Sequence, residues 1–251
     1  MYNEIFKIGF ISIHGYGLMI GIGILCALVI AGKRAKKKGL DADFVYSLGI
    51  VSLVFGFIGA KLLYCIVEIN AFLNDPMRIL SGSGFVLYGG IIGGILAAMI
   101  YCKFKRVSFL QYFDLTVPSV ALAQGFGRIG CFLAGCCYGR ETDSAIGIVF
   151  HNSPIAPNGV KLIPTQLFSS AGDFLIAVVL LVYARKDRKT GKVGALYLIL
   201  YSMGRFIIEF FRNDYRGSIG ILSTSQFISL IILVIGSLMF FMKELPWTNK
   251  E

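Results

Sequence analysis

Charged and phenolic side chains recur at helical spacing inside an apolar stretch near residue 200. Tyr201, Arg205, Glu209 and Arg212 are separated by four, four and three positions, so one helix face would carry all of them. Another arginine, Arg128, ends a second apolar stretch. A guanidinium stays charged at neutral pH, and its planar fork can bind two oxygens of one anion. Arg128 and Arg205 therefore predict a site for a phosphate group, while the alternative for Arg205 and Glu209 is a structural ion pair.

A glycine-rich segment, residues 124–140, surrounds Arg128. Gly125, Gly127 and Gly130 formally match the dinucleotide-binding fingerprint, but that fingerprint must follow a strand and open a helix, whereas here it ends an apolar stretch. Glycines admit unusual φ values and the close approach of a ligand. We therefore expect irregular backbone here, which membrane depth tolerates where protein or a cavity covers it.

Three cysteines in this segment, Cys131, Cys136 and Cys137, leave three interpretations open. They are small packing residues in a tight turn, or a disulfide pair outside the cytoplasm, or a thiolate nucleophile activated by Arg128 or Arg140. Metal binding is the least favoured interpretation, since no histidine stands at ligand spacing. We expect no metal and no cofactor.

The elements that position these residues follow from composition. Of 251 residues, 56% are hydrophobic and 15% are charged, against about 25% charged in an ordinary soluble domain. The mean hydropathy is +0.76. This composition excludes disorder and a soluble globule, and it indicates an integral membrane protein. The alternating polarity of membrane β-strands is absent, so the fold class is all-α.

A membrane helix needs about 20 mostly apolar residues. Seven stretches qualify within one predicted domain over 1–251, and the shortest of them carries Arg205. The predicted spans are roughly 11–32, 44–66, 84–102, 108–127, 165–184, 193–210 and 222–242. Gly89, Gly90, Gly93 and Gly94 would support close helix packing, within the chain or between chains.

The net charge of +10 orients these spans. Fifteen basic residues fall on one side and six on the other, and basic loops stay cytoplasmic, so the N-terminus lies outside and the C-terminus inside. An anionic lipid surface accounts for this distribution, which excludes a nucleic-acid partner. The fifteen are Lys33, Arg34, Lys36, Lys37, Lys38, Lys103, Lys105, Arg106, Arg185, Lys186, Arg188, Lys189, Lys192, Lys243 and Lys250.

This topology brings Tyr16, Tyr88, Arg128 and Arg205 to one depth near the outer face. Charges inside a membrane usually face a cavity or a partner, so the shared depth favours an anion site there.

Three further charged residues within the spans receive structural interpretations. Lys61 is expected to snorkel to the interface. Asp114 is expected to anchor to the basic loop Lys103–Arg106, and Asp173 is a buried acid with no evident partner.

Five ordered motifs resemble the bacterial prolipoprotein diacylglyceryl transferase family over most of the chain. The motifs are His14-Gly15-Tyr16-Gly17-Leu18-Met19, the segment Phe85–Gly93 with Tyr88-Gly89-Gly90, the signature from Asp114 through Gln124, Arg128 and Gly130 to Gly139-Arg140, Pro164-Thr165-Gln166-Leu167, and Tyr201–Arg212. The resemblance implies transfer of diacylglyceryl from phosphatidylglycerol, or a related anionic phospholipid, to the lipobox cysteine of a prolipoprotein. Glycerol phosphate would be released at the outer face of the bacterial cytoplasmic membrane.

The resemblance also implies site roles. Arg128, Arg205, Tyr88 and Tyr16 would form the catalytic group. The substrate-binding residues would be Gln124, Gly130, Cys131, Gly139, Arg140, Tyr201 and Glu209.

The chain departs from the family pattern at polar positions. Tyr88, Cys131, Ala134 and Cys136 replace a histidine, two asparagines and a glutamate. Ile163 replaces a histidine before Pro164, and Phe168-Ser169 replaces Tyr-Glu. A tyrosine, with a pKa of about 10, is a poorer base at neutral pH than histidine. Two alternatives therefore stay open: a phospholipid-dependent transferase with a glycan or lipid-carrier acceptor, and a non-catalytic lipid-binding or transport protein.

Overall fold

The computed structural model describes residues 4–8, 11–82, 84–213 and 217–242. Its chain forms two compact units, one of 1–31 with 113–251 and one of 32–112. The prediction of a single domain over 1–251 stays a prediction. Arg216, Lys243 and Lys250, which entered the charge count, lie outside the described residues.

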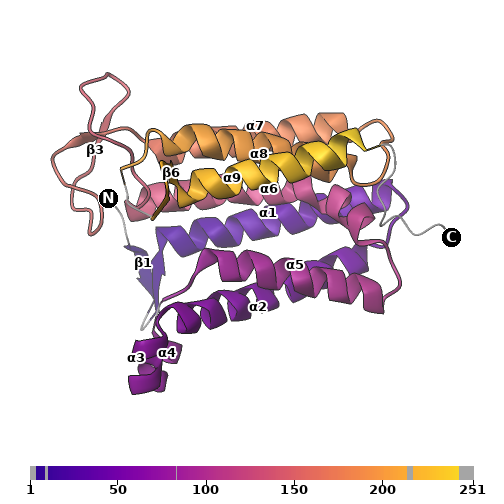
Figure 1. The fold of residues 1–251 in the computed structure, drawn as a ribbon, viewed down its shortest axis with the longest axis horizontal. Helices are drawn as coiled ribbons and strands as arrows, with labels where there is room; N and C mark the ends of the chain where they lie inside the picture. The colour runs from indigo at the N-terminus through magenta and orange to yellow at the C-terminus, as the bar shows by residue number, and fades with distance from the viewer. Residues whose placement is uncertain (1–3, 9–10, 83, 214–216, 243–251) are drawn as a thin grey trace. The chain divides into compact units, whose positions relative to one another are not determined.

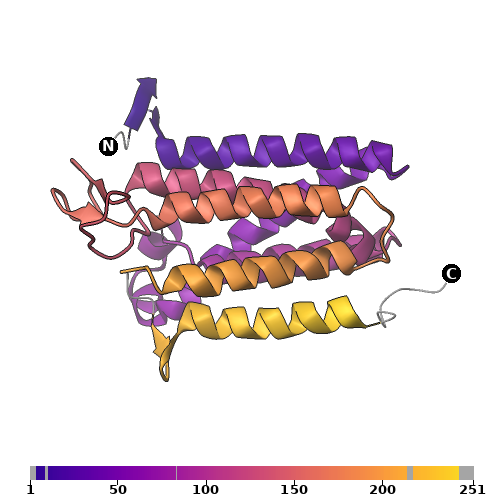
Figure 2. The same ribbon diagram turned by 90° about the horizontal axis from the view of Figure 1, so that it is seen from above.

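The first unit is built on five long helices that lie side by side (Figures 1 and 2). They are α1 (Gly15–Lys37), α6 (Phe109–Ala134), α7 (Thr165–Tyr183), α8 (Lys192–Glu209) and α9 (Thr224–Phe241), with the last residues of α1 and the first of α6 belonging to the second unit. Val117, Leu180 and Tyr197 are among the buried residues that join α6, α7 and α8 into one core. Helix α8 packs against both α7 and α9.

Asp114 fixes where α8 begins. Its carboxylate accepts hydrogen bonds from the backbone N–H groups of Gly191, at 2.5 Å, and Gly194, at 2.7 Å. A negative charge at a helix N-terminus satisfies backbone donors that the helix itself leaves open. This role at the start of α8 was not predicted, and the expected anchoring of Asp114 to the loop Lys103–Arg106 stays a prediction.

Short antiparallel strand pairs lie before α1 and in two of the connections between helices of this unit. They are β1 (Glu4–Ile8) with β2 (Ile11–His14), β3 (Ile148–Val149) with β4 (Lys161–Leu162), and β5 (Ser218–Ile219) with β6 (Leu222–Ser223). Between α6 and α7, Phe150, Ala156 and Leu162 form a small buried cluster. The polar connection after Arg140 is therefore an ordered loop with a core of its own.

The second unit pairs α2 (Ala42–Val67) with α5 (Leu87–Phe104), and the short helices α3 (Ile69–Asn74) and α4 (Pro76–Ser81) connect them. Glycines allow this contact, because a Cβ on Gly59 would collide with the carbonyl of Gly89, and the reverse also holds. A Cβ on Gly93 would lie 2.7 Å from the carbonyl oxygen of Phe55. The expected close packing of α5 therefore occurs within the chain.

Lys61 serves the same unit in a way that the sequence analysis did not foresee. Its Nζ donates to the carbonyl oxygen of Gly82 at 2.6 Å and to that of Gly84 at 3.3 Å, and it lies over the Phe85 ring. The ammonium therefore finds backbone acceptors in the segment before α5, and its expected position at the membrane interface stays a prediction.

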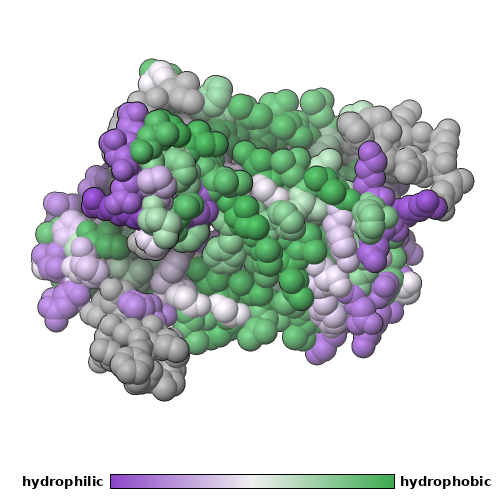
Figure 3. All heavy atoms as spheres, turned by 90° about the horizontal axis from the view of Figure 1, so that it is seen from below, coloured by the Kyte–Doolittle hydropathy of each residue, from purple (hydrophilic) through white to green (hydrophobic). Residues whose placement is uncertain are grey.

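A long helix forms at the place of each predicted span. Five of them agree with the predicted bounds within three residues, whereas α1 ends five residues later and α6 seven residues later than predicted. Of the part that the structure describes, six are long and apolar enough to cross a membrane: α1, α2, α5, α6, α7 and α9. Hydrophobic residues cover the middle of the face drawn in Figure 3, and hydrophilic residues gather at both ends. Such a surface belongs to a multi-pass, all-α membrane protein.

The glycine-rich segment corrects one expectation. Helix α6 continues through Gly125, Gly127 and Gly130 to Ala134, so this stretch is helical and not irregular. Neighbouring groups use the space that the missing side chains leave: a Cβ on Gly125 would lie 2.6 Å from the Phe174 ring, and one on Gly130 would lie 3.1 Å from the carbonyl oxygen of Tyr16. Glycine has a low helix propensity, and these packing contacts stabilise the helix in its place.

Irregular backbone begins directly after α6. Gly135 has φ +71°, and Cys137 has φ +64°, which is uncommon for a residue with a side chain. The chain reverses here and enters the loop toward α7.

Candidate active site

A cavity of about 140 Å³ lies between α6, α7 and α8 in the first unit. Both predicted anion-binding arginines line it, Arg128 from α6 and Arg205 from α8. The remaining lining residues are Phe168, Ser169, Gly172, Asp173, Ile176, Tyr201, Gly204, Ile207 and Ile208. The structure therefore brings together two guanidinium groups that are 77 positions apart in the sequence.

Asp173 has a partner, contrary to expectation. Its Oδ2 lies 3.9 Å from Nε of Arg128, and the side chains are 8% and 20% exposed. At this separation the two groups form an ion pair but no hydrogen bond. Within the described residues, Asp173 Oδ2 is buried and lacks a hydrogen-bond partner. The guanidinium donors of Arg128 are consequently not held by this carboxylate.

Arg205 is held from two sides. Its Nη2 lies 2.9 Å from Oε2 of Glu209 and donates to Oγ of Ser225 on α9, also at 2.9 Å. Arg212 adds a longer contact, with Nε 3.8 Å from the same oxygen of Glu209. The predicted i,i+4 ion pair of Arg205 and Glu209 is confirmed. Arg212 was expected on the same helix face, but α8 ends at Glu209 and Arg212 reaches this carboxylate from the segment that follows. The other terminal nitrogen of Arg205, Nη1, is buried and has no hydrogen-bond partner among the described residues.

Tyr201 and Gln124 occupy neighbouring positions next to this cavity. Tyr201 lines it and stacks on Tyr197 at 5.6 Å between ring centroids. The Tyr197 hydroxyl donates a hydrogen bond to Oε1 of Gln124 at 2.8 Å. Gln124 lies one helical turn before Arg128 in α6. Gln124 therefore supports the aromatic pair, and its predicted role in substrate binding stays a prediction.

The two predicted catalytic tyrosines lie in different units. Tyr16, in the first turn of α1, packs against Gly130 and is 44% exposed. Tyr88, in the first turn of α5, is 40% exposed and belongs to the second unit. Their catalytic roles stay predictions.

Gly139 is confined by the chain's own backbone. A Cβ there would lie 2.7 Å from the carbonyl oxygens of both Ile163 and Phe211. Gly139 donates to Ile163 O, and the next residue, Arg140, donates its N–H to Phe211 O. Gly139 thus permits the close approach of two backbone segments, the one that leads to α7 and the one that follows α8. The Arg140 side chain is exposed.

The three cysteines after Arg128 come together. The sulfur atoms of Cys131, Cys136 and Cys137 all lie within 4.8 Å of one another. All six cysteines of the chain lie in described regions, and the structure forms no disulfide among them. Hydrogen bonds with the Cys131 and Cys136 thiols, together with the Arg212 guanidinium, hold the pKa of Cys137 below its usual range.

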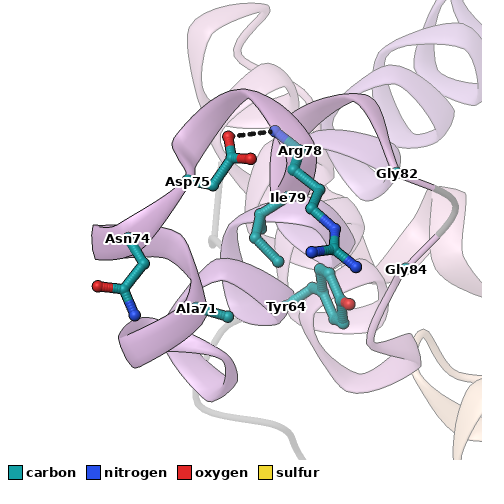
Figure 4. A pocket seen from close by; sticks show the side chains of 8 residues that line it. All are labelled: Tyr64, Ala71, Asn74, Asp75, Arg78, Ile79, Gly82 and Gly84. Atoms are coloured by element: carbon teal, nitrogen blue, oxygen red, sulfur yellow. Dashed lines mark hydrogen bonds between the residues drawn. The ribbon is translucent and has the colours of Figure 1, made fainter.

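A larger cavity, of about 570 Å³, lies in the second unit near α3 and α4 (Figure 4). The Arg78 guanidinium lies beside the Tyr64 ring there, and Asp75 accepts a hydrogen bond from the backbone N–H of Arg78. No residue from the predicted site lines this cavity. We place the candidate site at the smaller cavity, because two arginines and a carboxylate converge on it.

Asp173, Ser169 and Phe168 are lining residues that the sequence analysis did not assign to the site. Ser169 and Asp173 are four positions apart in α7, so they share a helix face. This spacing was the available signal, but it could not show that the face points toward Arg128.

The chain is similar to known proteins over nearly its whole length. A family model described as prolipoprotein diacylglyceryl transferase matches residues 3–242. The phosphatidylglycerol--prolipoprotein diacylglyceryl transferase of Clostridium tetani (strain Massachusetts / E88) is 51% identical over 237 residues, covering 94% of this chain and 95% of the relative.

Two relatives from Clostridium perfringens (strain 13 / Type A) carry the same name with the numbers 2 and 1. The first is 48% identical, covering 97% of this chain and 94% of its own length. The second is 37% identical, covering 92% and 90%. This chain belongs to the prolipoprotein diacylglyceryl transferase family.

Proposed function

We propose that this chain transfers the diacylglyceryl group of phosphatidylglycerol to the cysteine thiol of a prolipoprotein and releases glycerol phosphate. The relatives that are 48% and 51% identical over nearly the whole chain are named for these two substrates. The observation that carries the proposal in this structure is the convergence of Arg128 and Arg205 on one cavity.

The reaction builds negative charge on the leaving phosphate, and two arginines can stabilise this charge. The thiol sulfur bonds to the glyceryl carbon, and the C–O bond to phosphate breaks with its electron pair leaving on the phosphate oxygen. The thiol proton passes to a base. The leaving phosphate gains a negative charge in the transition state. Fixed guanidinium groups therefore stabilise the transition state more strongly than they stabilise the bound lipid before reaction. Nη1 of Arg205 has no hydrogen-bond partner among the described residues, so this donor is available to the phosphate.

The apolar part of the cavity suits the lipid. Phe168 and Ile207, which are 43% and 56% exposed, line it together with the charged groups. A phospholipid presents a phosphate directly beside acyl chains, so a cavity with arginines within and apolar side chains at its exposed walls matches its chemistry.

Asp173 is a positioning residue in this proposal. The family pattern has a glutamate where this chain has Ser169, and Asp173 stands one helical turn later on the same cavity. The carboxylate lies close enough to orient Arg128 and far enough to leave its donors for the phosphate. Tyr16, Gln124, Gly130, Cys131, Gly139, Arg140, Tyr201 and Glu209 complete the proposed site. The catalytic role of Tyr88, which lies in the second unit, stays a prediction.

We further propose seven membrane spans, with α8 as the seventh. Its 18 residues extend about 27 Å at 1.5 Å per residue, close to the hydrocarbon thickness. It carries three charged residues, Lys192 at its start and the Arg205–Glu209 ion pair, and these lower its hydropathy. The charge distribution favours an outer N-terminus, a cytoplasmic C-terminus and a site near the outer face of the bacterial cytoplasmic membrane.

Reconstitution tests the function. Purified protein in phosphatidylglycerol vesicles, given a lipobox peptide, should produce a lipidated thiol and an equal amount of glycerol phosphate. A matched peptide with serine at the acceptor position should produce neither. Glycerol phosphate release with no peptide-bound lipid would contradict the prolipoprotein acceptor, and expression that fails to support growth of a strain lacking its own transferase would do so as well.

A further inference from the structure

Three thiols meet at the end of α6, and the transfer step described above uses none of their sulfurs. Cys131 lies in the last turn of the helix, and Cys136 and Cys137 lie in the turn that follows it. Their Sγ atoms are all within 4.8 Å of one another. Cys131 is 9% exposed, and the other two are partly buried. The cluster is therefore largely shielded from solvent but not completely buried.

We propose that Cys131, Cys136 and Cys137 together bind one thiophilic metal cation, for which Zn²⁺ is the probe. Zinc–thiolate bonds of about 2.3 Å place tetrahedral ligands about 3.8 Å apart, so these sulfurs need to close by about 1 Å at most. Binding deprotonates the three thiols and releases their protons to solvent. Three protein ligands leave one tetrahedral position for water.

The backbone around the thiols is fixed from outside the cluster. The Cys137 carbonyl accepts a hydrogen bond from Oγ1 of Thr165, and the Cys136 carbonyl accepts one from Nε2 of Gln166, both at 2.7 Å. Thr165 and Gln166 are each 1% exposed at the start of α7. The three side chains are consequently held close together before any metal arrives, which lowers the entropic cost of binding.

The local charge also suits a metal–thiolate centre. Three thiolates and one divalent cation carry a net charge of −1. The Arg212 guanidinium, which is 6% exposed, lies against the Cys137 sulfur and supplies a matching positive charge. Soft thiolate ligands select Zn²⁺ and Cu⁺ over Mg²⁺ and Ca²⁺.

A disulfide is the competing chemistry at this place. It would use two of the three sulfurs and requires a separation of about 2.05 Å between them. The structure instead keeps three free thiols whose sulfurs all lie within 4.8 Å of one another. From the sequence we expected no metal, because no histidine stands at ligand spacing. The structure shows that three cysteine sulfurs lie together, so a metal can be bound without histidine.

Cobalt substitution tests the site without relying on transferase activity. The full-length protein, purified in detergent, reduced and stripped of metal, is titrated with Co²⁺ and then with Zn²⁺. The variant Cys131→Ser/Cys136→Ser/Cys137→Ser removes the cluster. The matched control Cys26→Ser/Cys65→Ser/Cys102→Ser removes three thiols from helices α1, α2 and α5. The single change Cys136→Ser serves if the triple variant does not fold.

We expect the wild type and the control to bind one metal ion per chain, with a thiolate-to-cobalt absorption band that Zn²⁺ abolishes. The cluster variant should lose the band, and Zn²⁺ should raise the unfolding temperature of the wild type but not of that variant. Reduced wild-type protein without the band would overturn the proposal, as would a folded cluster variant that keeps it. A disulfide within the cluster, combined with no metal bound after reduction, would overturn it too and identify a redox pair instead.

Discussion

Arg128 on α6 and Asp173 on α7 face one another at 3.9 Å, and both line the cavity that Arg205 enters from α8. This long ion pair orients a guanidinium without satisfying its donors. A phosphate that enters the cavity would therefore find Arg128 already in place. The relationship explains how a buried acid can assist an anion site without occupying it.

Asp173→Asn tests this relationship. The amide keeps the shape of the carboxylate but loses its charge, so Arg128 should become less well oriented. An ion pair of this length without a hydrogen bond contributes about 1 kcal/mol, which corresponds to a decrease in kcat/KM of roughly 5-fold. The measurement is the initial rate of glycerol phosphate release at several phosphatidylglycerol concentrations. Tyr183→Phe, distant from the cavity lining, is the control, and equal rates for D173N and wild type would contradict a positioning role.

Gly139→Ala should disrupt the crossing of two backbone segments. The new methyl group would lie 2.7 Å from two carbonyl oxygens, those of Ile163 and Phe211, and neither can rotate away. Overpacking of this kind costs about 1–3 kcal/mol, so the thermal unfolding midpoint should fall and activity with it. Gly127→Ala provides the comparison, because a Cβ added there would meet no neighbouring atom within 4 Å and the substitution favours the helix. A G139A protein as stable as G127A would show that the crossing tolerates a side chain.

Asp114→Ala should loosen the start of α8. Two backbone donors, those of Gly191 and Gly194, lose their carboxylate acceptor. Loss of such a cap costs about 0.5–2 kcal/mol. Hydrogen exchange of the first turn of α8 should accelerate, while α9 stays protected. The control is Asp143→Ala, which removes a carboxylate from an exposed loop position. Unchanged exchange in α8 would mean that the carboxylate does not determine where this helix begins.

Long apolar stretches made the helices predictable. The predicted span 165–184 appears as Thr165–Tyr183, and 193–210 appears as Lys192–Glu209. Helical spacing also gave the Arg205–Glu209 ion pair, since residues four apart lie on one face. These features depend on local periodicity, which a single sequence displays directly.

Features that depend on distant neighbours escaped prediction. Gly125 and Gly130 were expected in irregular backbone, yet α6 continues through them because Phe174 and Tyr16 fill the adjacent space. Asp173 lacked an evident partner because Arg128 lies 45 positions away in sequence. The clustering of three cysteine sulfurs likewise results from the turn after α6, which spacing does not specify.

The central claim is that Arg128 and Arg205 together bind the phosphate of the lipid substrate. The most direct measurement is glycerol phosphate release by Arg128→Gln and Arg205→Gln, with Arg188→Gln as the control because Arg188 is exposed in the loop before α8. Loss of one fixed donor to a developing charge typically costs about 100- to 1,000-fold in rate. We predict such losses in R128Q and R205Q and full activity in R188Q. The unfolding temperature of R205Q should also fall, because Glu209 loses its buried partner at 2.9 Å. Full activity in either folded cavity variant would contradict the account.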